Sequence, residues 1–263
     1  MLKARTPWQV TRAVWHAMFM RELVARTMAD RMAWFWMLAE PIAIVSLMLF
    51  IRTVVFGRTR VLMNAEFVPW LIVGLMGFIL FRATMMQSLA AVSMNSSLFA
   101  YRQVKPVDTV LVRCYLEFAL RSFIFILFIL GGVLLELGLL ADLPIEALFS
   151  WISLWMLGLG LGLVFSVLAN LVNEIGIIVR VMSVPLLLLS FVIKPIYWVP
   201  HNLLPYVLMN PIVHGLETLR MSFFKDYVSV PGIDLLYLWY WALSSILLGL
   251  ILHKYFEPKL KQK

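Results

Sequence analysis

Long apolar stretches separated by short polar ones dominate this chain. A membrane-crossing helix needs about 20 mostly apolar residues, because the hydrocarbon core is about 30 Å thick and a helix rises about 1.5 Å per residue. Six stretches meet this requirement: Trp34–Ile51, Phe67–Ala91, Val107–Leu137, Leu148–Val172, Ile175–Ile193 and Leu235–Phe256. The pattern therefore predicts an all-α integral membrane protein with six transmembrane helices.

A leader precedes the first of these stretches. Pro7 suits the first turn of a helix, and the pattern predicts a helix over Pro7–Thr27. Its apolar side comprises Val10, Ala13, Val14, Ala17, Met18 and Val24, with Arg12, His16 and Glu22 opposite. We expect an amphipathic helix lying on the cytosolic leaflet, and a poorly ordered basic tail is the alternative.

The proline-rich stretch Pro195–Ile233 remains apolar between its prolines. Leu203–Met209 and Ile212–Phe224 are too short to span, which is typical of a re-entrant helical hairpin. Asn210 and Pro211 fit the cap and first turn of the second short helix. The expected organisation is a cytosolic leader over residues 1–33, a transmembrane domain over 34–256 with the re-entrant segment at about 195–232, and a basic cytosolic tail over 257–263.

Composition excludes a soluble protein. Hydrophobic residues make up 63% of the 263 residues and charged residues 14%, too little polar surface to cover a water-exposed globule. The net charge of +8 has a topological explanation, because cytoplasmic loops retain Lys and Arg. The basic residues are most numerous on the side that holds the N-terminus, which predicts that both termini are cytosolic.

The sequence offers no catalytic constellation and no cofactor site. No glycine precedes a lysine, as a phosphate-binding loop requires, and the four histidines are dispersed, which disfavours a metal site. No paired carboxylates lie within a predicted span. The run Gly158–Gly162 alternates glycine and leucine in mid-span, which favours close helix packing.

Arginines inside predicted spans are the first functional candidates. Arg82 and Arg121 each cost about 2.5–3.5 kcal/mol to insert, so they should face a bundle interior, a water-filled path or a partner. Alternatively, Arg121 pairs with Glu117 one turn away, or both arginines extend toward the cytosol. Arg52 could lengthen a basic path at the outer end, and its sign would favour an anionic cargo.

Two further local patterns carry a hypothesis. Glu217 and Arg220 share one face of the second short outer helix, and a local ion pair is the favoured interpretation. The cytoplasmic stretch Ser97–Tyr101 is partly apolar and flanked by basic residues, which indicates a protein contact.

Three motifs resemble those of ABC-2 polysaccharide export permeases. They are Asn173–Ile178 followed by Pro185 and Lys194-Pro195-Ile196-Tyr197-Trp198; Met209–Val213 with Glu217 and Arg220; and Tyr101–Asp108, which is similar to the loop of the capsular-polysaccharide branch (group 2 capsules). The resemblance covers nearly the whole chain in order. Many relatives carry Arg where this chain has Asn173, so a basic role does not transfer to that position.

The resemblance implies a type V ABC exporter-like fold and a homodimer. Each subunit would join a separate ATP-binding subunit, which holds ATP and Mg²⁺. The cargo would be lipid-linked acidic capsular polysaccharide crossing a Gram-negative inner membrane, with a periplasmic adaptor and an outer-membrane polysaccharide exporter as further partners.

The resemblance also suggests roles for individual residues. Candidates for contact with the ATPase are Ser97, Leu98, Tyr101, Arg102, Gln103, Lys105, Asn173 and Glu174. Candidates for the substrate channel are Arg82, Arg121, Arg52, Lys194, Trp155, Tyr197 and Trp198, although packing is the favoured interpretation of Trp155. Pro195, Asn210, Pro211, Glu217 and Arg220 belong to the re-entrant hairpin, which would border the outer exit.

Other functions remain open at this point. A permease of the same class could carry another cargo, such as O-antigen lipid, teichoic acid or a small hydrophobic compound. A membrane-bound glycosyl- or acyltransferase would need a catalytic constellation at one membrane face, which the sequence lacks. A non-transporting membrane scaffold is the third alternative.

Overall fold

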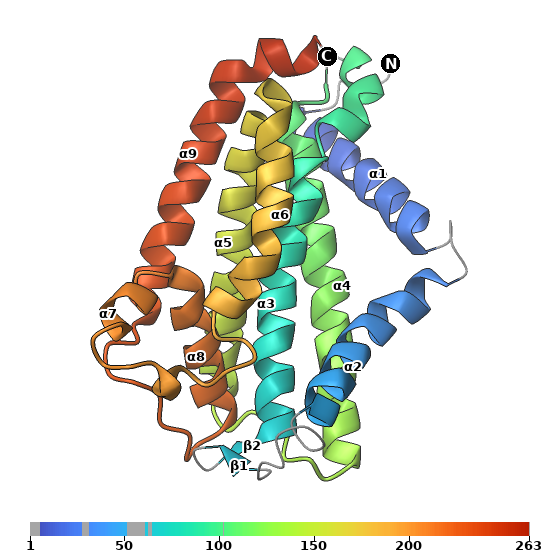
Figure 1. The fold of residues 1–263 in the computed structure, drawn as a ribbon. Coiled ribbons are helices and arrows are strands. Elements are labelled where there is room, and N and C mark those ends of the chain that lie inside the picture. The colour runs from blue at the N-terminus through green and yellow to red at the C-terminus, as the bar shows by residue number, and fades with distance from the viewer. Residues whose placement is uncertain (1–5, 28–31, 52–60, 63–64, 102, 263) are drawn as a thin grey trace.

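The computed structural model describes residues 6–27, 32–51, 61–62, 65–101 and 103–262. Helices account for nearly all of its elements (Figure 1), and they are α1 (Pro7–Thr27), α2 (Ala33–Phe50), α3 (Phe67–Leu89), α4 (Pro106–Leu134), α5 (Pro144–Leu171), α6 (Asn173–Leu189), α7 (Leu204–Val207), α8 (Pro211–Phe223) and α9 (Leu235–Lys261). Short 3-10 helices are η2 (Ser93–Ala100) and η3 (Ile196–Trp198). Arg52 and Arg102, two of the candidate residues, lie outside the described residues.

Four of the described helices are long and apolar enough to cross a membrane: α3, α4, α5 and α9. The helices therefore support the conclusion drawn from the composition, that the chain is an integral membrane protein. The other two predicted spans correspond to α2 and α6, which have 18 and 17 residues.

The core is built around α5, which lies between α3 and α9. A methyl group on Gly158 would lie 2.7 Å from the Phe81 carbonyl oxygen of α3, and one on Gly162 would lie 2.6 Å from Ser88 Oγ. Gly160 faces the other way, where a methyl group would overlap Ser245 of α9. The interpretation of this glycine run as a close-packing surface is confirmed.

Helix α1 has the predicted bounds and packs against α4, with Met18 buried in the core. The predicted polar face is wrong at Glu22. This side chain is half-buried on the face toward α4, because it pairs with Arg113 there.

Several helix ends differ from the sequence prediction. Helix α4 ends at Leu134 rather than Leu137, where Glu136 and Gly138 adopt positive φ angles of 56° and 60°. Helix α6 ends at Leu189 rather than Ile193, just before Phe191 with a φ of 54°. Helix α9 continues to Lys261, beyond the predicted end at Phe256.

The end of the molecule that holds α7 and α8 also contains a small element that the sequence pattern did not predict. Strands β1 (Val61–Leu62) and β2 (Ala65–Glu66) form an antiparallel hairpin directly before α3. Asn210 caps α8 by accepting a hydrogen bond from the Ile212 amide at 3.1 Å, and Pro211 is the first helical residue. The predicted cap is therefore confirmed.

Candidate functional site

Charged side chains from α1 and α4 meet inside the bundle. Arg113, Glu117 and Arg121 recur every fourth residue, so they share one face of α4. Glu22 and Arg26 have the same spacing on α1 and face them. These five residues, together with Gln87 of α3, are called the charged cluster below.

Positively and negatively charged residues alternate along the contacts of the charged cluster. Arg113 Nε lies 2.8 Å from Glu22 Oε1, and Arg26 Nε lies 3.6 Å from the same oxygen. Arg26 also bonds Glu117, whose second oxygen lies 3.4 Å from Arg121 Nε. Arg26 Nη2 donates to Gln87 Oε1 at 3.0 Å. Glu117 is therefore shared by an arginine of α1 and an arginine of its own helix.

Burial gives these contacts their strength. The Glu117 side chain is 2% exposed, where an ion pair is screened little by water and is costly to break. Burial lowers the pKa of Arg26, and the Glu22 carboxylate opposes this by raising it. The charged cluster thus fixes the position of α1 on the bundle.

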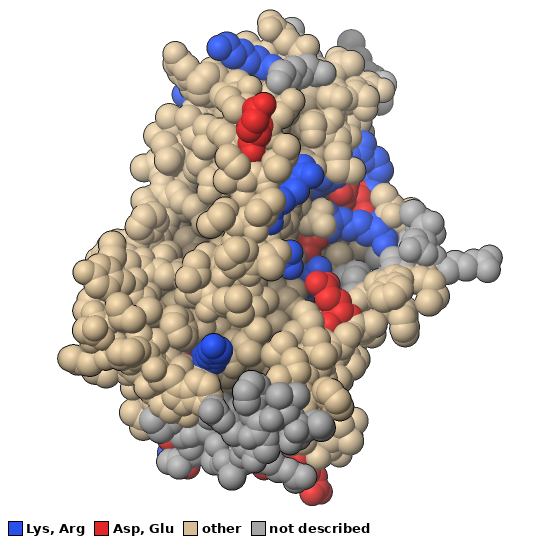
Figure 2. Space-filling view, in the orientation of Figure 1, with Lys and Arg blue, Asp and Glu red and all other residues tan. Residues whose placement is uncertain are grey.

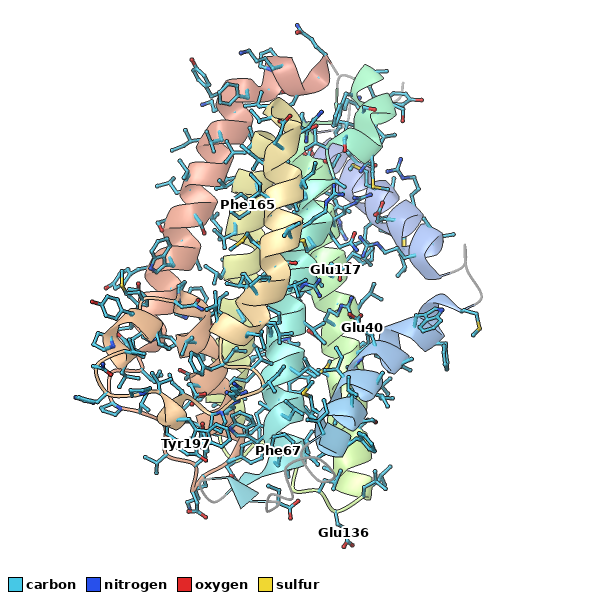
Figure 3. The ribbon with its side chains drawn as sticks, in the orientation of Figure 1. Glu40, Phe67, Glu117, Glu136, Phe165 and Tyr197 are labelled. Atoms are coloured by element: carbon cyan, nitrogen blue, oxygen red, sulfur yellow. The ribbon has the colours of Figure 1, made fainter. Side chains whose placement is uncertain are left out.

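Acidic and basic side chains gather around a hollow between the α1–α2 side and the rest of the bundle (Figure 2). Glu40 of α2 interacts electrostatically with Arg121, and Figure 3 shows Glu40 and Glu117 at neighbouring levels on this side. Arg82 Nε of α3 donates to Ser183 Oγ of α6 at 3.3 Å. Arginines and glutamates alternate around the hollow. Its net charge is therefore more nearly balanced than that of the basic path predicted from the sequence.

Helix α1 also contacts the start of α4 and the loop between α3 and α4. Trp15 Nε1 donates to Asp108 Oδ1 at 2.9 Å, and the other Asp108 oxygen accepts from the Lys105 amide at 3.0 Å at the start of α4. Arg21 bonds the Asn95 side chain in η2. These two hydrogen bonds connect α1 to the loop and to the start of α4.

The candidate ATPase-contact residues lie at the end of the bundle that carries this loop and the α5–α6 turn (Figure 1). Ser97, Tyr101, Gln103, Lys105, Asn173 and Glu174 are exposed, and Leu98 is half-buried. Asn173 and Glu174 form the first turn of α6. The structure thus brings both groups to one end of the bundle.

The aromatic channel candidates occupy different places. Trp155 is buried and donates from Nε1 to the Cys114 carbonyl at 3.0 Å, with its ring 4.8 Å from that of Phe118. It takes part in packing between α4 and α5. Tyr197 and Trp198 belong to η3 at the opposite end of the bundle, where Trp198 and the preceding Lys194 are exposed.

Sequence reasoning missed the roles of Glu22, Arg26, Arg113 and Glu40. The spacing of the α4 charges was visible in the sequence, since three charged residues at four-residue intervals are unusual in an apolar helix. The partners on α1 were not, because about ninety residues separate them from α4. Among the described residues, no group of three or more His, Cys, Asp and Glu side chains is placed to hold a metal ion.

Comparison with known proteins points to one family, although no family model matches the chain. The chain is 30% identical over 253 residues to the polysialic acid transport protein KpsM of Escherichia coli, covering 95% of this chain and 96% of that protein. It is 27% identical over 243 residues to the capsule polysaccharide export inner-membrane protein CtrC of Neisseria meningitidis, covering 89% and 86%. For BexB of Haemophilus influenzae, a protein with the same description, the identity is 28% over 249 residues, covering 92% and 90%.

Proposed function

This chain belongs to the family of inner-membrane capsule polysaccharide export proteins, and we propose that it is the permease subunit of an ATP-driven exporter of lipid-linked acidic capsular polysaccharide. The observation that carries the proposal is the similarity to these relatives over nearly the full length of both chains. The membrane-crossing helices agree with such a role.

We propose six membrane spans, formed by α2, α3, α4, α5, α6 and α9, with both termini in the cytosol. The apolar character of α2 and α6 supports the first part, since both are only slightly shorter than a full span. The concentration of basic residues on the N-terminal side supports the orientation. The short helices α7 and α8 would form a re-entrant hairpin at the periplasmic face.

The cargo path would run through the hollow beside the charged cluster. In a homodimer, a second copy would cover this open face and complete the path. Arg82 is the strongest candidate for contact with an acidic polymer, because its hydrogen-bond partner Ser183 carries no compensating charge. Arg121 is a second candidate because it lies beside the same hollow, although Glu117 and Glu40 both oppose its charge.

Two separate ATP-binding subunits would supply the energy, with ATP and Mg²⁺ bound there. They would contact the surface formed by η2 and the α5–α6 turn. The bonds of Trp15 and Arg21 support this assignment, because they join α1 to the same loop and to the start of α4. A periplasmic adaptor and an outer-membrane exporter would receive the polymer.

A deletion of this chain in its own cells tests the proposal. We expect capsular polymer to accumulate in the cytosol, and the restored chain to return export and to co-purify with an ATP-binding subunit. Accumulation of a different glycolipid would instead indicate another cargo. Normal export in the deleted cells, or purification without any ATPase, would contradict the assignment.

A further inference from the structure

A second ion pair lies buried at the η3 end of the bundle, apart from the charged cluster. Arg220 Nη1 and Glu217 Oε1 of α8 are 2.7 Å apart, and their side chains are 0% and 1% exposed. Further hydrogen bonds offset the cost of burying two charged groups. Here those bonds lead to two different segments of the chain.

Arg220 holds the segment that follows α6. Its Nη1 donates to the Phe191 carbonyl at 3.1 Å, and its Nη2 donates to the Val192 carbonyl at 2.8 Å. Phe191 has a left-handed φ of 54°, which is unfavourable for a residue with a side chain and needs support from its surroundings. Lys194 and η3 follow directly, so this contact sets their direction.

Glu217 holds the segment that follows α8. Its Oε2 accepts hydrogen bonds from the Tyr227 hydroxyl at 2.8 Å and from Ser229 Oγ at 2.6 Å. Burial, and secondly the Glu217 carboxylate, raise the pKa of Tyr227, so the hydroxyl keeps its proton and remains a donor. One ion pair therefore anchors the connections on both sides of α8.

Helix α3 is shaped to receive the guanidinium. Arg220 Cζ lies 3.6 Å from the centroid of the Trp70 ring, and one turn further along α3 is Gly74. A methyl group on Gly74 would overlap Arg220 Nη2. The glycine therefore leaves the space in which the docked guanidinium lies.

We propose that the Glu217–Arg220 pair positions the outer exit of the transport path, with Arg220 directing Lys194, Tyr197 and Trp198 through the carbonyls of Phe191 and Val192. The pair is a positioning element and does not touch cargo, because both side chains are buried among protein groups. The inference rests on the proposed function, in which this segment borders the exit.

The first arm of the test measures the position of the segment. Cys114 is the only cysteine of the chain and is buried, so Lys194→Cys provides one accessible thiol. Its labelling by a membrane-impermeant maleimide is followed in spheroplasts carrying the complete transporter. We expect Gly74→Ala and Arg220→Gln each to change the labelling rate by about threefold or more, since the rate follows local exposure. Gly131→Ala is the matched control, because no neighbouring atom of the described residues lies within 4 Å of the added methyl group.

The second arm measures capsule export in chains that retain Lys194. Gly74→Ala and Arg220→Gln should both reduce export at equal protein level, and the double variant should be no worse than either alone, because both act through one guanidinium. Arg220→Lys keeps the charge opposite Glu217 and serves where Arg220→Gln does not accumulate. Arg220→Lys should still change the labelling rate, since the lysine ammonium cannot reproduce the paired hydrogen bonds of the guanidinium to the Phe191 and Val192 carbonyls.

Failure of the inference and failure of the proposed function have different signatures. Labelling and export of Gly74→Ala equal to those of Gly131→Ala would overturn the inference. Additive effects of Gly74→Ala and Arg220→Gln would overturn it as well. If the unmodified chain does not restore export to deleted cells, the proposed function fails, and the labelling arm alone then decides whether the pair positions the segment.

Discussion

Glu117 is the residue on which the charged cluster depends most. It contacts Arg26 of α1 and Arg121 of α4, and its side chain is 2% exposed. Removing its charge would leave two arginines in an apolar bundle with one carboxylate fewer. Glu117 thus contributes both to the docking of α1 and to the charge of the hollow.

Glu117→Gln should therefore lower the free energy of unfolding by about 3–5 kcal/mol, because it breaks a buried pair from one side. Thermal unfolding of the purified protein in detergent measures the change. Glu257→Gln is the control, because Glu257 pairs with Lys261 near the surface, at 2.7 Å, and such pairs contribute about 0–1 kcal/mol. Equal melting temperatures for the two variants would contradict a structural role for Glu117.

Arg82 and Arg121 give a prediction about transport rather than stability. Arg82→Gln together with Arg121→Gln should reduce export while the protein level stays constant, because Glu117 retains Arg26 as its partner. Cell-surface polymer is measured against chain abundance, with Lys259→Gln as control because Lys259 is exposed on α9. Unchanged export would remove both arginines from the cargo path.

At the scale of elements, the glycines of α5 determine how closely three helices approach. Gly158 and Gly162 face α3, while Gly160 faces Ser245 and the Ile246 amide of α9. This alternation arises because residues two apart lie on nearly opposite sides of a helix. Small residues are the usual means by which membrane helices pack closely.

Gly160→Ala should separate α5 from α9 and cost about 1–3 kcal/mol, as overpacked cores do. Gly131→Ala, in open surroundings on α4, should be neutral or stabilising by up to about 1 kcal/mol. Thermal unfolding of both variants compares them directly. Equal stability of the Gly160→Ala and Gly131→Ala proteins would contradict this prediction, because it would show that α5 and α9 accommodate the added methyl group without cost.

The elements were largely predictable, since apolar runs, Pro7 and the Asn210–Pro211 cap are local signals. Their partners were not. Nothing in the period of α5 indicates that α9 covers Gly160, and Glu22 was assigned to the wrong face because its partner Arg113 is far away in the sequence. The Glu117–Arg121 contact was predictable because four residues separate the two side chains.

At the scale of the whole molecule, the two ends of the bundle differ in structure (Figure 1). One end presents exposed residues of the α3–α4 loop and the α5–α6 turn. The other end is held by the Glu217–Arg220 pair. The charged cluster lies between them and ties α1 to α4 and, through Gln87, to α3.

Tyr101→Ala combined with Lys105→Glu should weaken recovery of the ATP-binding subunit in purification, because both side chains are exposed on the proposed contact surface. Tyr240→Ala is the control, since Tyr240 is 71% exposed on α9 and Tyr101 is 67% exposed. Recovery unchanged by the double variant would place the ATPase contact elsewhere.

The central position of α5 has a consequence for biogenesis. Helix α3 is synthesised before α5, but α9, which covers the Gly160 face, emerges from the ribosome much later. Until then, the narrow surface of α5 faces lipid or the insertion machinery. Translation interrupted between α8 and α9 should therefore yield an unfinished bundle that membrane proteases remove, and pulse-chase of such a chain would reveal its short lifetime.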